Sequence, residues 1–372
     1  YRALQSVIAE YPALTNGELT PLAQTRSGST ISQLTARDSN QPPAVFKDGL
    51  KEKVRKERKG VESWHKVFPG LAPRILAYQK QGDGAALLIE HLPGYTFEHI
   101  LLNEPKPLLD AALDALNTTL RNVWRKTRTD TAQPANFMAQ LEARLPAITS
   151  AHGTLLQSQI KVGAYRPANF KQLIKRAARI EKTLPPSFSV YIHGDFNVDN
   201  IIFDPTAERI HFIDLHRSRY MDYLQDVSVF MVSCFRLPKR AFTDADRRSR
   251  VVLAMDTTAR RFANASGDEF YDIRLALGLA RSFASSIRFT ADRTQAKSLL
   301  NRARYLLERV TSVDARDYPA FKATLREIFC DFEKTPHRRS RHSRQMVHSP
   351  TSRPLGSADR FSAHCGYGAG AA

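Results

Sequence analysis

Acidic and amide side chains interrupt an otherwise apolar segment that runs from Val190 to Asp204, VYIHGDFNVDNIIFD. Asp195, Asp199 and Asn200 lie between two runs whose apolar character predicts buried strands. Because a strand on each side fixes the ends of the connecting loop, Asp195 and Asn200 can point into one space. Each residue taken alone would also fit a turn in which the side chain bonds to its own backbone, and Asp199 keeps that interpretation.

A further acidic residue, Asp214, ends the apolar strand in the segment RIHFIDLHRSR. If residues 201–203 and 210–213 pair as a hairpin, Asp214 returns to the neighbourhood of Asn200. Two carboxylates and one amide oxygen then converge, and so many oxygens are costly to bury without a cation. Oxygen ligands with room for water fit Mg²⁺ that is bound together with substrate phosphates. We therefore expect Asn200 and Asp214 to hold the metal and Asp195 to accept a proton from an incoming hydroxyl, as phosphoryl transfer requires.

Together the two loops resemble the catalytic and metal-binding loops of the aminoglycoside phosphotransferase and choline kinase family, whose members are small-molecule relatives of protein kinases. The residues that carry the resemblance are His193, Gly194, Asp195, Asn200, Ile213 and Asp214. The continuation FIDLHRSRYMDYLQDVSVF resembles the antibiotic-kinase version, with Arg217, Asp222 and Asp226 at the matching positions. The resemblance covers about residues 19 to 330 and implies that Asp226 braces the catalytic loop and does no chemistry.

The first part of the chain resembles the ATP-binding half of the same family. Lys47 in AVFK is placed like the strand lysine that contacts the α- and β-phosphates, and Glu57 is placed like its ion-pair partner. The segment RSGST is placed like the phosphate-covering loop, and LLIEHLPG like the hinge whose backbone contacts adenine. The nucleotide-binding residues that the resemblance implies are Lys47, Glu57, Ser27, Gly28, Ser29, Glu90 and Leu92.

Two features depart from the family pattern. The segment RSGST holds the single glycine Gly28 where a G-x-G-x-x-G would cradle phosphate, and one glycine is also compatible with a strand bulge. Glu52 and Glu62 are alternative ion-pair partners for Lys47, and Gly60 is expected to interrupt the helix that bears them.

Strand patterns dominate the first part of the chain, and helical patterns dominate the second. We expect one strand over LTPLAQTRSGSTISQLTA, another at AVFK, a helix in residues 48–68 and a hairpin in residues 74–92. After Leu92-Pro93-Gly94 the expected helices cover roughly residues 107–127, 136–161, 170–183, 241–265, 269–289 and 295–311. This order predicts an α+β fold, and the resemblance implies its two-lobed, protein-kinase-like form, with a β-rich N-terminal lobe and a mainly helical C-terminal lobe.

Three regions follow from these patterns. Residues 1–92 are expected to form the nucleotide-binding lobe, and residues 93–333 the helical lobe with the catalytic and metal loops. Residues 334–372 are rich in Arg, Ser, Pro and His and show no apolar period, which predicts a basic disordered tail.

The composition limits the class of partner and the cellular setting. The 372 residues carry a formal net charge of +18, from 55 basic and 37 acidic residues, which attracts phosphate-bearing ligands, nucleic acid and anionic membrane surfaces. No segment approaches the roughly 20 apolar residues that a membrane span needs. Cys234, Cys330 and Cys365 show neither paired nor metal-ligand spacing, which favours a reducing, cytoplasmic setting.

These observations predict an ATP- and Mg²⁺-dependent phosphotransferase whose partner is a small molecule with an acceptor hydroxyl, such as a sugar, an amino alcohol or an aminoglycoside-like compound. The region after Asp226 is poor in acidic clusters, which favours a neutral or anionic acceptor. Its arginines are Arg236, Arg240, Arg247, Arg248, Arg250, Arg260 and Arg261. Arg217 and Arg219 are expected either to contact the substrate or the transferring phosphate, or to form salt bridges with Asp222 or Asp226.

Three alternatives from other classes stay open. A nucleotide-binding pseudokinase or regulatory module would keep the site without turnover, although the complete set of Lys47, Asp195, Asn200 and Asp214 argues against it. A nucleic-acid-binding protein would fit the net charge, but neither a base-stacking motif nor a zinc-ligand spacing is present in the sequence. A protein kinase would differ only in its acceptor.

Overall fold

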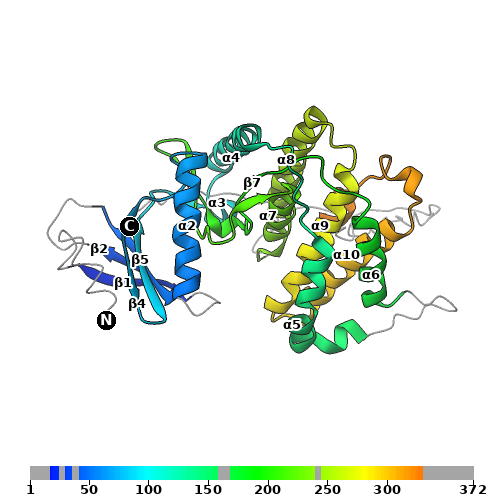
Figure 1. Cartoon of the computed structure of the whole chain (residues 1–372), viewed down its shortest axis with the longest axis horizontal. Coiled ribbons are helices and arrows are strands. Elements are labelled where there is room, and N and C mark those ends of the chain that lie inside the picture. The colour runs from blue at the N-terminus through cyan, green and yellow to red at the C-terminus, as the bar shows by residue number, and fades with distance from the viewer. Residues whose placement is uncertain (1–16, 25–29, 36–41, 158–167, 239–243, 330–372) are drawn as a thin grey trace, which may run out of the picture. The chain divides into compact units, whose positions relative to one another are not determined.

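The computed structural model describes residues 17–24, 30–35, 42–157, 168–238 and 244–329. Its N-terminal part is a five-stranded antiparallel sheet in the order β1-β2-β3-β5-β4 (Figure 1). The strands are β1 (Glu18–Gln24), β2 (Thr30–Thr35), β3 (Ala44–Leu50), β4 (Ile75–Gln81) and β5 (Gly84–Glu90). The hairpin expected in residues 74–92 is present as β4 and β5.

The segment LTPLAQTRSGSTISQLTA contains two strands where one was expected. Strands β1 and β2 pair antiparallel, with Leu19 opposite Leu34. Folding the segment back on itself lets the two halves satisfy each other's backbone N–H and C=O groups. Ser27, Gly28 and Ser29, which were predicted to cover the phosphates, lie outside the described residues.

Alternation along β3 sends successive side chains to opposite faces of the sheet. Ala44 and Phe46 pack in an apolar cluster on one face. Lys47 points to the other face, where Val54 of helix α2 (Lys51–Val67) packs against the sheet. The register of the sheet therefore sets Lys47 beside helix α2.

Helix α2 runs without a break through Gly60, where an interruption was expected. A Cβ atom at Gly60 would lie 2.1 Å from the carbonyl oxygen of Leu215, so only glycine lets the helix come this close to the chain after Asp214. Trp64, one turn further on, donates a hydrogen bond from Nε1 to Ser218 Oγ over 2.8 Å. Helix α2 therefore contacts the loop after Asp214 at two successive turns.

The variant Gly60→Ala is expected to lower the free energy of unfolding by about 1 to 3 kcal/mol, the usual cost of overpacking. In an exposed helix interior the same change would stabilise by about 1 kcal/mol, so the sign of the effect separates the two cases. Gly153→Ala, directly after the non-helical residue His152 of helix α5 (Phe137–Gln157), is the control for a glycine with room, because its Cβ would lie an ordinary 3.5 Å from Thr149 Cγ2. Urea unfolding of both variants measures the difference, and a Gly60→Ala protein as stable as its parent would refute the close contact.

The rest of the described chain is mainly helical, as predicted. Besides α5, the helices are α3 (Phe97–Asn103), α4 (Lys106–Thr127), α6 (Phe170–Glu181), α7 (Leu224–Arg236), α8 (Asp244–Ser266), α9 (Tyr271–Ser286), α10 (Arg293–Thr311) and α11 (Leu325–Phe329). Short 3₁₀ turns form η2 (Val198–Asn200), η3 (Ile287–Phe289) and η4 (Ala315–Asp317). A three-stranded sheet has the order β6 (Tyr95–Thr96), β8 (Ile201–Asp204), β9 (Arg209–Phe212), and a two-stranded sheet pairs β7 (Val190–Ile192) with β10 (Arg219–Met221). The predicted α+β class is confirmed.

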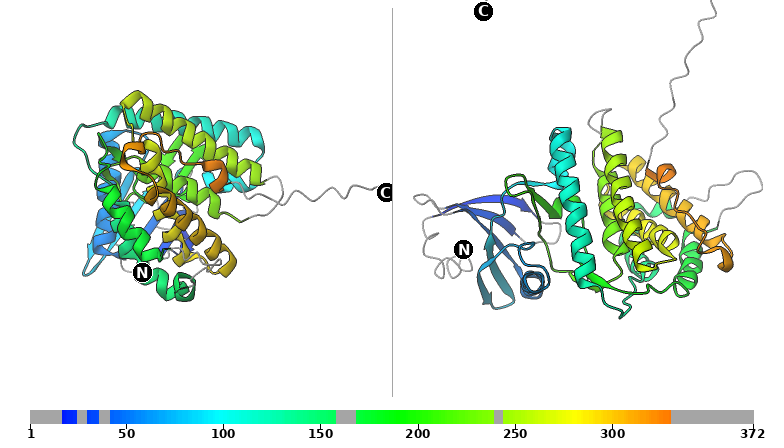
Figure 2. Two further views of the ribbon diagram at one scale, coloured as in Figure 1. Left: turned by 90° about the vertical axis from the view of Figure 1, so that its right-hand side faces the viewer. Right: turned by 90° about the horizontal axis from the view of Figure 1, so that it is seen from above.

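Helix α9 is the most enclosed helix of this part, with α5, α7 and α10 packed around it (Figure 2). Every residue of α9 is buried. A helix that is buried all round normally carries apolar side chains on every face, yet α9 carries Arg274 and Arg281. Arg274 forms 2.7 Å ion pairs with Asp222 and Asp268, whereas Arg281 lines the cavity described below.

The apolar core crosses the predicted lobe boundary at residue 92. Val61 and Trp64 of α2 are buried in the same cluster as Phe97 and Leu113 of the helical part. The two regions, residues 1–92 and 93–333, thus share one apolar core. Their division into a nucleotide-binding lobe and a helical lobe remains a proposal about their functions.

Three sequence features fall partly or wholly outside the described residues. The basic tail from residue 334, Cys330 and Cys365 all lie beyond them, while Cys234 is a buried free thiol. Within the described ranges, none of the helices combines the length and the apolar character that crossing a membrane requires.

Candidate active site

The predicted hairpin between residues 201 and 213 is formed and brings the two polar loops together. Ile201 pairs with Phe212 across strands β8 and β9. Directly beyond this pair, the backbone N–H of Ile213 donates to the carbonyl oxygen of Asn200 over 3.0 Å. Asp214 follows immediately, so the hairpin register sets its side chain next to Asn200.

The loop before the hairpin is held from below by Asp226, in the first turn of α7. Its two carboxylate oxygens accept hydrogen bonds from the backbone N–H groups of His193 and Gly194, over 2.7 and 2.8 Å. The bracing contact implied by the resemblance is therefore present. Gly194 has φ +85°, and a Cβ there would lie 2.4 Å from the carbonyl oxygen of Arg217, so glycine is required at this bend.

His193 is a structural histidine of the loop. The backbone N–H of Asp195 donates to His193 Nδ1 over 3.3 Å. Since Nδ1 accepts, the ring proton is on Nε2, which donates to the carbonyl oxygen of Ile213 over 2.8 Å. Both ring nitrogens are used within the loops, and the ring is buried, so His193 is not placed to act on a substrate.

The brace at Asp226 predicts a pH dependence of activity. Burial raises the pKa of Asp226 to about 6, although the hydrogen bonds from the two backbone donors oppose this rise. Protonation places a hydrogen on an oxygen that must accept from the loop, so we expect kcat to fall as the pH decreases through about 6. Between the ordinary aspartate pKa near 4 and this value the folded state binds more protons than the unfolded chain. The contribution of Asp226 to stability therefore increases as the pH falls across this range.

If kcat falls near pH 6 while the protein stays folded, the fall would be assigned to the loop at His193 and Gly194 that Asp226 braces. Parallel measurement of kcat and of thermal unfolding between pH 5 and 8 tests this. Asp226→Asn has no carboxyl group to titrate, so its lower kcat should lack the same acidic decline. An unchanged decline in that variant would contradict the assignment.

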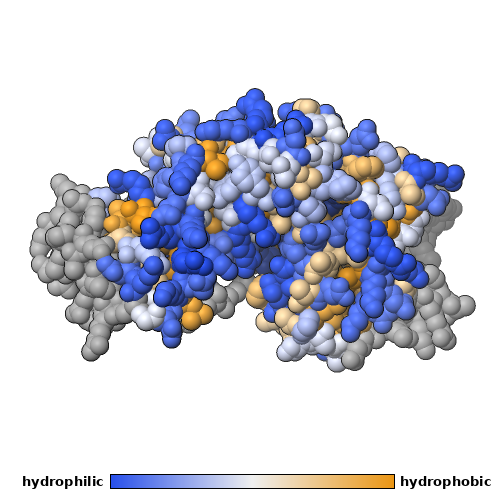
Figure 3. Space-filling view, in the orientation of Figure 1, coloured by the Kyte–Doolittle hydropathy of each residue, from blue (hydrophilic) through white to orange (hydrophobic). Residues whose placement is uncertain are grey.

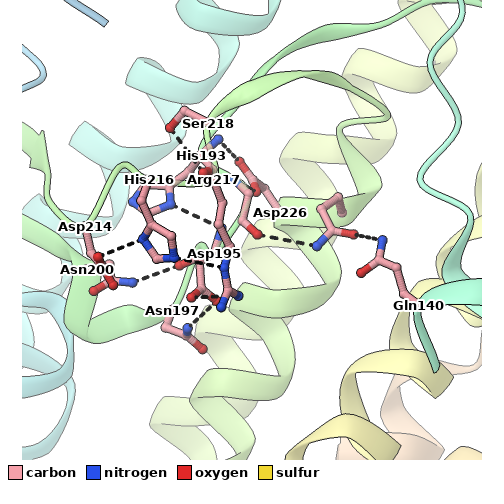
Figure 4. A network of polar contacts seen from close by, with 12 residues as sticks. Gln140, His193, Asp195, Asn197, Asn200, Asp214, His216, Arg217, Ser218 and Asp226 are labelled. Atoms are coloured by element: carbon pink, nitrogen blue, oxygen red, sulfur yellow. Dashed lines mark hydrogen bonds and ion pairs between the residues drawn. The ribbon is translucent and has the colours of Figure 1, made fainter. Parts of the chain in front are cut away.

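Asp195 is oriented by three contacts (Figure 4). Its Oδ1 accepts a hydrogen bond from Asn197 Nδ2 over 3.0 Å, and its Oδ2 forms an ion pair with Arg217 Nη1 at 3.0 Å. Asn200 Nδ2 donates to the backbone carbonyl oxygen of Asp195 over 2.9 Å. Arg217 therefore pairs with Asp195, and the salt bridge considered for Arg217 with Asp222 or Asp226 does not form.

Asp214 is connected to Asp195 through two side chains that the sequence did not single out as a pair. Arg217 Nε donates to His216 Nε2 over 3.1 Å, so the proton of His216 is on Nδ1. His216 Nδ1 then donates to Asp214 Oδ1 over 2.9 Å. Burial alone would raise the pKa of Asp214, but the His216 hydrogen bond and the charge of Lys47 outweigh it and hold that pKa well below its usual range. Asp214 is thus an anion at neutral pH.

The predicted pair of Lys47 and Glu57 is present. Lys47 Nζ donates to Glu57 Oε1 over 2.9 Å, and both side chains are nearly buried. The rival partners are engaged elsewhere on α2, because Glu52 pairs with Arg55 and Glu62 pairs with Arg58. Burial lowers the pKa of Lys47, but the charges of Glu57 and Asp214 outweigh it and raise that pKa. Lys47 is therefore a fixed cation next to Asp214.

The residues around Asp214 fit a small divalent cation. Glu57, Asp214 and His216 each offer a ligand atom within 4.8 Å of the other two. His216 already donates to Asp214, and the Glu57 side chain is only 6% exposed against 38% for Asp214. Asp214 is therefore the accessible oxygen ligand of the group. Asn200 uses its Nδ2 on the loop backbone, which leaves Oδ1 as a second oxygen next to it.

One cavity of about 1170 Å³ contains all the described residues that the sequence proposed for the site. Its lining includes Lys47, Glu57, Glu90, Leu92, Asp195, Asn200 and Asp214. The face drawn in Figure 3 is mostly hydrophilic and is hollowed between α2 and α5. Sequence reasoning missed His216 and three arginines of the lining, Arg144, Arg281 and Arg288. The signal for His216 was its place two residues after Asp214, whereas the arginines lie in segments that carry no motif.

Comparison with known proteins identifies the family of this chain. The sequence pattern of the phosphotransferase enzyme family matches residues 49–261, more than half of the chain. No curated protein matches the chain. Among solved structures, an aminoglycoside phosphotransferase from Streptomyces rimosus is 18% identical with a TM-score of 0.46, over 83% of this chain and 98% of its own. An ethanolamine kinase from Plasmodium vivax is 13% identical with a TM-score of 0.42, over 79% and 82% of the two chains. From the match over residues 49–261, the chain belongs to the phosphotransferase enzyme family.

Proposed function

We propose that this protein transfers the γ-phosphoryl group of ATP to a hydroxyl group of a small molecule. The observation that carries the proposal is that Asp195, Lys47 and Asp214 line a single cavity. A general base, a phosphate-binding cation and a metal ligand are the parts that phosphoryl transfer needs in one place.

The nucleotide would lie on the sheet side of the cavity. Lys47, fixed by Glu57, would bind the α- and β-phosphates, and the backbone of Glu90 and Leu92 would bind adenine. Asn200 and Asp214 would hold Mg²⁺, which when bound offsets the negative charge of the phosphates. Asp214 is ionised at neutral pH for the reasons given above, and an ionised carboxylate is the form that binds a hard cation.

Asp195 would accept the proton of the acceptor hydroxyl. Each of its oxygens has one protein partner, and a carboxylate oxygen has a second lone pair with which to accept another proton. Asn197 and Arg217 thus orient the base without occupying it fully. A positioned general base contributes roughly 10²–10⁴ to the rate, and binding both substrates in one cavity supplies a further part through proximity.

The experiment is a turnover assay with Mg-ATP and a panel of acceptors, with ADP release as the readout. The panel contains sugars, sugar phosphates, amino alcohols and aminoglycosides, and a protein substrate tests the protein kinase alternative. We expect at least one small molecule to raise ADP release far above the rate with water. Mg-ATP binding without turnover on any acceptor would instead identify a pseudokinase. A cytoplasmic location, where ATP is supplied, is part of the proposal.

A further inference from the structure

Four arginines line the cavity together with Asp195, and they come from four different elements. Arg144 lies on α5, Arg217 on the loop after β9, Arg281 on α9 and Arg288 in η3. We refer to these four residues as the arginine cluster. The charge of Asp195 acts on Arg144, Arg281 and Arg288, whereas Lys47 belongs to strand β3 of the sheet.

Most of the positive charge in the arginine cluster is not neutralised by protein carboxylates. Arg217 pairs with Asp195, but among the described residues no carboxylate oxygen lies within 4.0 Å of Arg144, Arg281 or Arg288. Arg144 donates to the carbonyl oxygen of Gln140 over 2.7 Å, and Arg281 donates to Gln225 Oε1 over 2.8 Å. These partners are neutral, so they orient the guanidinium groups and leave their charge in place.

The cluster also contains donors that have no acceptor. The Nε atoms of Arg281 and Arg288 are buried and have no hydrogen-bond partner among the described residues. Arg281 is only 4% exposed, and leaving a charged donor unsatisfied at such a site is costly. A buried guanidinium normally has an anionic partner.

The electrostatics agree with this geometry. Burial, together with the charge of Arg144, lowers the pKa of Arg281 to about 9. Burial, together with the charges of Arg288 and Arg217, lowers the pKa of Arg144 to about 10. Asp195 opposes the decrease for both residues. The cluster is therefore a set of mutually repelling cations that an additional anion would stabilise.

Resting on the proposed function, we propose that the acceptor is a phosphate monoester that also carries a hydroxyl group, and that the arginine cluster binds its phosphate. A phosphate monoester brings up to two negative charges and three equivalent oxygens, which suits several convergent guanidinium groups better than a single carboxylate does. Bound in this way, the ester would present its hydroxyl to Asp195, which lines the same cavity and pairs with Arg217 of the cluster.

Cationic acceptors fit this side of the cavity poorly. Among the other acidic residues of the lining, Glu57 pairs with Lys47, Glu90 pairs with Arg74, and Asp292 accepts from the backbone N–H of Thr294 as the N-cap of α10. Glu98, Asp199 and Asp214 also line the cavity, and Asp214 is proposed to hold the metal. Asp195 has to serve as the base. An ammonium group placed beside Arg144, Arg281 and Arg288 would therefore be repelled by three guanidinium groups whose charge no carboxylate of the described residues neutralises.

The test is calorimetric titration of the protein loaded with Mg-ADP, which fills the nucleotide side first. The probes are inorganic phosphate, glucose 6-phosphate, glucuronate, glucose and glucosamine. We expect inorganic phosphate and glucose 6-phosphate to bind at least about tenfold more tightly than glucose. The affinity of glucuronate should lie between that of the phosphate probes and that of glucose. Failure of both phosphate probes to bind, or tighter binding of glucosamine, would overturn the proposal.

Variants assign the binding to the cluster. Arg144→Gln and Arg288→Gln change half-buried residues and keep a polar side chain, so they avoid the folding risk of replacing Arg281. We expect each to weaken phosphate binding about tenfold, through the loss of one charge-assisted contact, and to leave Mg-ADP binding unchanged. Arg125→Gln, an exposed arginine on α4 outside the cavity, is the matched control and should bind like the parent. Weaker Mg-ADP binding in the cluster variants would show that the arginines serve the nucleotide, which overturns the proposal.

The same variants separate this proposal from the proposed function. If an uncharged or cationic acceptor is phosphorylated at the same rate by the parent, Arg144→Gln and Arg288→Gln, the function stands and the anionic acceptor is refuted. If the phosphate probes bind through the cluster but no acceptor raises ADP release, the anion site is supported and the phosphotransferase function fails.

Discussion

Asp195→Asn will bind Mg-ATP like the parent but will lower kcat by a factor of about 10²–10⁴, the usual contribution of a general base. Asparagine keeps the shape of the side chain and can still accept from Asn197 through Oδ1, so the loop geometry should survive. It cannot take the proton of an acceptor hydroxyl. ADP release with the best acceptor of the panel measures kcat, and calorimetry with Mg-ADP measures nucleotide binding.

The neighbouring Asp199 provides the control for this prediction. It lines the same cavity, but no contact assigns it a part in the reaction, so Asp199→Asn should retain most of the activity. Equal activity of Asp195→Asn and the parent would remove the assigned base. A loss of Mg-ADP binding in Asp195→Asn would point to a role in the nucleotide site instead.

Replacement of Asp214 should have the second large effect, because it removes the accessible carboxylate next to Asn200. Metal ions supply several kcal/mol of charge stabilisation in such reactions, so we expect kcat to fall by about 10³ or more. Unlike Asp195→Asn, this change should also remove the Mg²⁺ dependence of nucleotide binding. Titration of ADP with and without Mg²⁺ measures that dependence directly.

Two substitutions at Asp214 are needed because its backbone is unusual. Asp214 has φ +60°, in the left-handed region that asparagine tolerates and alanine adopts less readily. Asp214→Asn therefore removes the charge with little strain, whereas Asp214→Ala adds strain to the loss. If Asp214→Asn keeps full Mg²⁺-dependent binding, the residue is not the metal ligand, whatever Asp214→Ala does.

Elements formed by residues close in sequence were predictable. The hairpin of β8 and β9 follows from two apolar runs separated by the polar segment DPTAER, and it alone brings Asp214 back to Asn200. The sequence also contains a reason why Lys47 pairs with Glu57 and not with Glu52 or Glu62. The two rivals each have an arginine three or four residues away on the same helix, where it can form a local ion pair, and those pairs are present.

Features that depend on tertiary packing were not predictable. Gly60 indicates a weak helix when only its own segment is considered, and the reason for it, the carbonyl group of Leu215, lies in a distant part of the chain. The arginine cluster is a stronger case. Arg217 follows the metal-binding loop and could be singled out, but Arg144, Arg281 and Arg288 belong to segments that the sequence predicts as ordinary helices. Only the packing of α5 and α9 brings these three to the same cavity as Asp195.

The contact between Gly60 and Leu215 has a consequence for regulation. A kinase that is inactivated by outward displacement of a helix requires loose packing between that helix and the metal-binding loop. Here the backbone of α2 at Gly60 packs directly against the carbonyl group of Leu215. An outward movement of α2 would therefore also move the loop after Asp214, and would disturb Glu57 and Asp214 together. We therefore expect the turnover rate to depend on substrate concentration and product release, and not on a switch of helix α2 between an inactive and an active conformation.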